Sequence, residues 1–136
     1  MGWLDNLKRI LGEPQEESPT EAPQPEDFDR PTPRHIGAEE FEALKQNGVL
    51  VVDFWAEWCQ PCHLLAPTID RLAETYGESA VVAKLNVDEH PDVASGLGIM
   101  GIPTVIIFKD GQEVQRFVGV QPYERLAQAL DKALNG

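Results

Sequence analysis

The segment Val51-Val-Asp-Phe-Trp-Ala-Glu-Trp-Cys-Gln-Pro-Cys-His63 is the most informative part of the chain. It belongs to a run from Val49 to Ala56 that is rich in β-branched and aromatic residues, which is typical of a central strand covered on both faces. Two cysteines follow the run with two residues between them, and the chain has no others. This spacing favours a redox-active dithiol.

A helix is predicted directly after the strand, because apolar residues recur at helical spacing up to Gly77. These residues are Leu64, Leu65, Ile69, Leu72, Ala73 and Tyr76. Cys59 should therefore lie at a helix N-terminus, where the helix dipole and free N–H groups stabilise a thiolate and make it the nucleophile. Cys62, one turn further on, is placed to attack a mixed disulfide. Pro61 at the helix start removes no needed hydrogen bond.

Two other kinds of site use paired cysteines. Zinc usually takes four ligands, and the chain has no second cysteine pair. The motif Cys-x-x-Cys-His also attaches c-type haem, with His63 as the axial ligand and Met100 as a sixth ligand. Haem attachment needs export, and the N-terminus lacks the continuous apolar core of a secretory signal. We therefore expect no metal and no cofactor.

The surroundings of the dithiol resemble the thioredoxin family. Trp58-Cys-Gln-Pro-Cys62 after Val52-Asp-Phe-Trp-Ala56 matches the family's active-site pattern. The similarity covers about residues 35 to 136 and continues in the family's order through Lys84-Leu-Asn-Val-Asp88, Gly101-Ile-Pro-Thr104, Phe108-Lys-Asp-Gly111 and Val118-Gly119. The resemblance implies a protein disulfide reductase, a thiol–disulfide oxidoreductase that acts through Cys59 and Cys62.

Two residues of the active-site loop depart from the family pattern. Gln60 stands where the family usually has glycine, and His63 stands where it often has lysine or arginine. In this family the residues between and after the cysteines tune the redox potential. In this chain these residues are Gln60, Pro61 and His63. An oxidase or isomerase is therefore kept as an alternative to the reductase.

Asp53 is an acid inside an apolar strand. Burial should raise its pKa and let it exchange protons near neutral pH. By resemblance, Asp53 is the buried acid that takes the proton of Cys62, through water, and Lys84 on the next strand is its neighbour. The alternative is a structural aspartate held by hydrogen bonds.

The resemblance also implies a substrate-binding surface. The peptide bond before Pro103 is expected to be cis and to face the cysteines, leaving the backbone of the preceding residue free to pair with substrate. Trp58 is expected to form an apolar platform beside Cys59. A flat apolar rim, suited to unfolded or extended protein substrates, is expected from Gly101, Ile102 and Gly119.

The remaining pattern predicts an α/β domain. Strands are expected at 34–36, 49–55, 80–87, 104–108 and 114–118, and helices at 38–47, 59–76, 91–95 and from Pro122 onward. Asp110-Gly111 is a strong hairpin signal. This order, with the resemblance, predicts a thioredoxin-like fold with a central mixed sheet of four to five strands flanked by about four helices.

We expect three parts in the chain: a short amphipathic helix at 1–12, a disordered linker rich in proline and glutamate at 13–33, and the thioredoxin domain at 34–136. A helix as short as 2–11 needs a surface to lie on. We expect that surface to be a protein groove or the chain's own domain. The acidic linker makes an anionic membrane a poor fit. It also stays open that residues 2–11 have no fixed role.

The net charge of −12 argues against nucleic acid and anionic membranes as partners. Two cysteines in one motif form no structural disulfide framework, which fits a reducing cytoplasm. The expected partners are disulfide-containing proteins and, by resemblance, a flavin- and NADPH-dependent reductase of the thioredoxin-reductase type. A different class of function is also open: an adaptor or chaperone module that docks through residues 2–11.

Overall fold

A five-stranded mixed sheet forms the centre of residues 31–136, the part of the chain that the computed structural model describes. Its strands are β1 (Arg34–His35), β2 (Val49–Trp55), β3 (Val81–Asn86), β4 (Thr104–Lys109) and β5 (Gln112–Val118). They lie in the order β1-β3-β2-β4-β5. β2 runs parallel to β3 and antiparallel to β4, which confirms the predicted mixed sheet. The expected helix at 1–12 and most of the expected linker lie outside the described residues.

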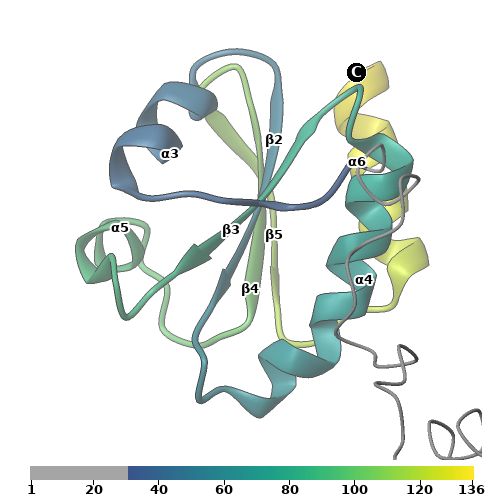
Figure 1. The fold of residues 1–136 in the computed structure, drawn as a ribbon. Coiled ribbons are helices and arrows are strands. Elements are labelled where there is room, and N and C mark those ends of the chain that lie inside the picture. The colour runs from purple at the N-terminus through teal and green to yellow at the C-terminus, as the bar shows by residue number, and fades with distance from the viewer. Residues whose placement is uncertain (1–30) are drawn as a thin grey trace, which may run out of the picture. The chain divides into compact units, whose positions relative to one another are not determined.

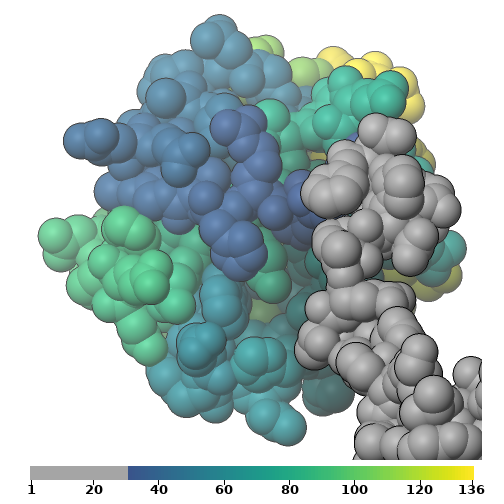
Figure 2. Space-filling model, in the orientation of Figure 1, coloured from purple at the N-terminus to yellow at the C-terminus, as the bar shows by residue number. Residues whose placement is uncertain are grey.

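Four helices cover the sheet in this part of the chain. They are α3 (Ala38–Lys45), α4 (Gln60–Tyr76), α5 (Pro91–Gly96) and α6 (Tyr123–Asn135). Figure 1 shows α3 and α5 on one face of the sheet and α4 and α6 on the other. In the space-filling view, the side chains of α3 and α5 lie next to each other over their face (Figure 2). The predicted α/β architecture, a mixed sheet flanked by helices, is confirmed. No helix between residues 31 and 136 has the length and apolar character to span a membrane.

β2 is buried on both faces, as its predominantly apolar sequence predicts. Successive side chains of a strand point to opposite faces. Val49 and Val51 pack into the cluster formed by α4 and α6, together with Leu65 and Leu130. The alternate residues of β2 pack into the cluster on the side of α3 and α5, namely Leu50, Val52 and Phe54. The strand that leads to the cysteines is therefore held from both sides.

α4 begins where the sequence predicts. Cys59 is its N-cap, with an extended backbone (φ −89°, ψ 105°), and Pro61 lies in the first turn. Pro67 stands inside the helix, where it has no N–H to donate. Figure 1 shows α4 changing direction along its length, as a proline inside a helix favours. The bend leaves the first turn of α4 free to lie at the end of the sheet.

The hairpin predicted at Asp110-Gly111 joins β4 and β5, and its turn has two residues. Lys109 pairs with Gln112, and Asp110 and Gly111 both have positive φ (48° and 92°). Positive φ at both turn residues is the type I′ geometry that Asp-Gly favours. Because the turn is this short, β5 begins at Gln112, two residues earlier than predicted. α3 ends at Lys45, two residues before its predicted end.

Candidate redox site

A disulfide joins Cys59 and Cys62 at the N-terminal end of α4, with their Cα atoms 5.3 Å apart. The backbone N–H of Cys62 donates to Cys59 Sγ at 3.2 Å. Both residues are almost wholly buried, with 3% and 2% of their surfaces exposed. The N-cap position of Cys59 and the N–H that Cys62 donates to its sulfur are the features that stabilise a thiolate on Cys59 once the disulfide is reduced.

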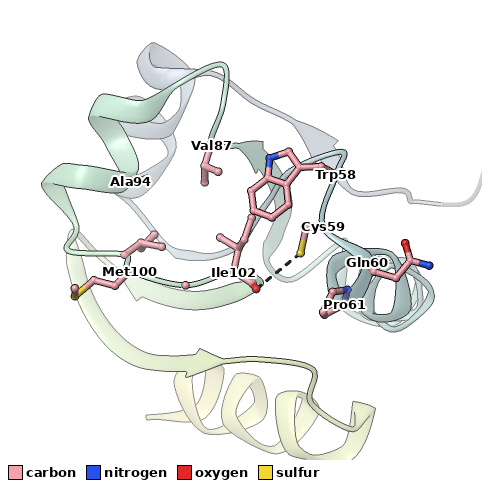
Figure 3. A pocket seen from close by; sticks show the side chains of 10 residues that line it. Trp58, Cys59, Gln60, Pro61, Val87, Ala94, Met100 and Ile102 are labelled. Atoms are coloured by element: carbon pink, nitrogen blue, oxygen red, sulfur yellow. Dashed lines mark hydrogen bonds between the residues drawn. The ribbon is translucent and has the colours of Figure 1, made fainter.

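An open apolar pocket of about 590 Å³ lies beside Cys59 (Figure 3). Trp58 stands at its mouth with 70% of its surface exposed, and its indole N–H donates to Asp88 Oδ2 at 2.9 Å. This bond fixes the ring in place while leaving its face open. The pocket is lined by residues of four separate stretches of the chain: Trp58, Cys59, Gln60, Pro61, Val87, Ala94, Ile99, Met100, Gly101 and Ile102.

The peptide bond between Ile102 and Pro103 is cis, as predicted from the resemblance. The carbonyl oxygen of Ile102 lies 3.8 Å from Cys59 Sγ, along the dashed line of Figure 3. Two hydrogen bonds hold this segment. Thr104 Oγ1 donates to the carbonyl of Gly101 at 2.6 Å, and the N–H of Gly119 donates to the carbonyl of Pro103 at 2.8 Å. Gly119 therefore holds the segment through its backbone, and it is not among the residues that line this pocket.

Asp53 lies in the middle of β2 and has no exposed surface. Burial raises the pKa of its carboxyl from 3.8 to about 7, and the positive charge of Lys84 lowers the pKa by a smaller amount. Lys84 is its register partner on β3, as predicted. Neither carboxylate oxygen has a hydrogen-bond partner among the protein atoms of residues 31–136.

Three basic side chains lie around the ring of Trp55 at the end of β2. Lys84 Nζ lies 4.9 Å from the ring centroid, and the rings of His35 and His63 each stand edge-on to it at 6.2 Å. Trp55 is half-buried and packs against the buried cluster of Ala56, Cys59 and Cys62. The two histidines flank its ring because β1 and α4 converge on the end of β2.

His63 also holds the active-site loop. Its Nε2 lies 2.7 Å from the carbonyl oxygen of Glu57, so a protonated Nε2 donates to that carbonyl. This bond ties the first turn of α4 to the residue before Trp58. Gln60 and Pro61 are exposed at the edge of the pocket. The predicted tuning residues of the loop are thus all close to the dithiol, and Lys84 lies deeper, beside Asp53.

The far wall of the pocket was missed by sequence reasoning. Val87, Ala94 and Ile99 line it, and none of them was a predicted site residue. Met100 was considered only as a haem ligand. The sequence holds only a weak signal for this wall. Val87 is an apolar residue in the connection after β3, Ala94 lies in α5, and Ile99 lies in the connection before Pro103.

The comparisons with known proteins agree with this geometry. The thioredoxin family model matches residues 33–132. A thioredoxin of Staphylococcus aureus is 50% identical over 95 residues, which are 70% of this chain and 91% of that protein. A mutant thioredoxin from Halobacterium salinarum superposes with a TM-score of 0.72 at 35% identity, covering 77% of this chain and 94% of that one. A thioredoxin of Malassezia sympodialis gives a TM-score of 0.71 at 30% identity, covering 85% and 98%. The matched region contains every site residue described above.

Proposed function

Because the chain belongs to the thioredoxin family of thiol–disulfide oxidoreductases, we propose that it serves as a general cytoplasmic thioredoxin that reduces protein disulfides through Cys59 and Cys62. The observation that carries this proposal is the geometry of Cys59. It caps α4, receives an N–H of the helix on its sulfur, and opens onto an apolar pocket. A nucleophile, its stabilising donor and a substrate surface therefore meet at one sulfur atom.

The reaction has two steps. The Cys59 thiolate attacks one sulfur of a substrate disulfide, which breaks the substrate S–S bond and forms a mixed disulfide while one substrate thiolate leaves. The Cys62 thiolate then attacks Cys59 Sγ and expels the second substrate thiolate. Two electrons pass to the substrate, and the protein is left with the Cys59–Cys62 disulfide seen in the structure.

Asp53 is the proposed base for the second step. Its pKa of about 7 lets it gain or lose a proton at neutral pH, whereas an ordinary aspartate stays ionised there. The proton leaves Cys62 through water and reaches the Asp53 carboxylate. Lys84 limits the rise of that pKa and so keeps the carboxylate available as a base at neutral pH.

Substrate binding is assigned to the surface around the pocket. Trp58 and Ile102 offer apolar contact on either side of Cys59, and Gly101 leaves room for a peptide backbone. Pro103 fixes the course of this segment, and Gly119 holds it through the Pro103 carbonyl. An extended peptide with a disulfide fits such a surface better than a compact ligand does.

We assign the tuning of the redox potential to the residues around the dithiol. Gln60 and Pro61 lie between the two cysteines, and His63 holds the loop before Cys59 through its hydrogen bond to the carbonyl of Glu57. The oxidised protein needs an electron donor, for which we propose a flavin- and NADPH-dependent reductase of the thioredoxin-reductase type. Flavin and NADPH belong to that partner in this scheme, and this chain supplies only its dithiol.

The test is the reduction potential of the Cys59–Cys62 pair in the full chain, measured in graded dithiol buffers with tryptophan fluorescence. A value near −270 mV is expected for a reductase. A value between about −180 and −120 mV would overturn the proposal in favour of an oxidase or isomerase. The Cys59→Ser variant should lose all disulfide reduction. If it keeps its cellular role, the adaptor alternative is favoured.

A further inference from the structure

Met100 forms part of the pocket wall and is almost fully open to solvent. It has 97% of its surface exposed and lines the same pocket as Trp58 and Cys59. In Figure 3 it lies at the opposite end of the pocket from Gln60 and Pro61, with its thioether sulfur turned outward. Apart from Met1 it is the only methionine of the chain.

Among residues 31–136, Met100 is the sulfur that an oxidant reaches most easily. Cys59 and Cys62 are nearly buried and, in the disulfide form, already paired with each other. Exposure governs the oxidation of methionine to its sulfoxide, which changes a flexible apolar side chain into a polar one. A single exposed apolar side chain is common on protein surfaces and needs no explanation alone. Here it lines the same pocket as a second exposed apolar side chain, Trp58.

We propose that Met100 is a peroxide-sensitive modification site whose oxidation weakens the binding of protein substrates to the redox site. The proposal rests on the proposed function, since it concerns the regulation of that same pocket. In the step, a lone pair of the Met100 sulfur attacks one oxygen of hydrogen peroxide. The O–O bond breaks and an S=O bond forms. The sulfur loses two electrons, and the second oxygen leaves as water with both protons.

The effect should fall on substrate binding and leave the dithiol chemistry intact. A docked peptide covers the pocket wall, so it would have to strip water from the strongly polar S=O group without a buried partner to replace that water. Cys59 keeps its N-cap position and its donor from Cys62, neither of which involves Met100. We expect the KM for a protein disulfide to rise at least fivefold. The rate with a small aromatic disulfide, which needs little of the wall, should stay the same.

The test uses the full chain in its disulfide form, which shields both cysteines during treatment. The protein is exposed to hydrogen peroxide, freed of oxidant and reduced with dithiothreitol. Peptide mapping by mass spectrometry then locates the added oxygen. Reduction of insulin and of a small aromatic disulfide is measured before and after treatment. The Met100→Leu variant is the matched control because it retains Met1, and each protein is compared with its own untreated form.

The expected result is a rise in KM for insulin that appears in the natural chain and not in Met100→Leu. An unchanged KM with Met100 fully oxidised would overturn the proposal, and so would an equal rise in the variant. Failure of the proposed function looks different, because the untreated protein would then fail to reduce insulin at all.

A second measurement tests whether bound substrate covers Met100. A peptide held on Cys59 as a mixed disulfide in the Cys62→Ser variant should slow the oxidation of Met100 severalfold. An equal oxidation rate with and without the peptide would mean that substrate docks elsewhere, and this would also overturn the proposal.

Discussion

Replacing Asp53 with asparagine should stabilise the protein, and the gain should depend on pH. The side chains have nearly the same shape, so the substitution removes the ionisation of Asp53 with little change in packing. Asp53 is wholly buried, and its carboxylate oxygens have no hydrogen-bond partner within the described residues. Ionisation at this position is therefore costly, since a buried charge needs a partner.

The magnitude follows from the pKa. Burial raises the pKa of Asp53 from 3.8 to about 7, even though Lys84 acts in the opposite direction. A difference of this size corresponds to about 4 kcal/mol between the protonated and ionised forms. Because the folded pKa lies above the unfolded one, the folded protein binds more protons than the unfolded chain between about pH 4 and pH 7. Stability therefore falls as the pH rises through this window, and it is level above it.

The assay is guanidinium unfolding of the disulfide form from pH 4 to pH 8.5, followed by tryptophan fluorescence. The free energy of unfolding of Asp53→Asn minus that of the natural chain should grow by about 4 kcal/mol over this range. Taking this difference cancels the titration of the other carboxyls. Asp70→Asn, at an exposed position of α4, controls for the loss of one carboxylate. A difference for Asp53→Asn that stays constant within about 1 kcal/mol would refute the reasoning.

Two further substitutions test neighbouring contacts. Lys84→Gln removes the charge that lowers the pKa of Asp53, so the pH above which stability becomes level should move above about 7 in the same unfolding series. An unchanged pH would mean that Lys84 does not act on Asp53. Tyr76→Phe removes the hydroxyl that donates to Asp131 Oδ1 at 2.8 Å between α4 and α6, which should cost about 1 kcal/mol in guanidinium unfolding. No loss would show that water replaces this exposed bond equally well.

Local signals in the sequence predicted most of the fold. β2 was found with both ends right, because an unbroken apolar run starts directly after Gly48 and ends before a turn. The Asp110-Gly111 pair predicted the hairpin because few other residues accept positive φ twice in succession. The capping of α4 by Cys59 followed from the apolar stripe after it. Each of these features is decided by neighbours along the chain.

Features that depend on distant segments were predicted poorly or only by resemblance. The cis bond before Pro103 has no local signature, since most bonds before proline are trans. The ring contacts of Trp55 arise where β1, β3 and α4 converge on the end of β2. The far pocket wall depends on how α5 packs over the sheet. No periodicity in the sequence encodes such convergence.

In the proposed mechanism, the reacting groups and the groups that recognise substrate lie at different depths, so we expect that the two can be altered independently. The groups proposed to react are buried, where a low dielectric shifts the pKa of Asp53 and a helix N–H reaches Cys59. The groups proposed to meet substrate, Trp58 and Met100, are exposed. A change at Asp53 should therefore act on the pH dependence of turnover, and a change at Met100 on KM. If substitution of either residue altered both quantities together, binding and proton transfer would have to be coupled through the segment that ends at Ile102.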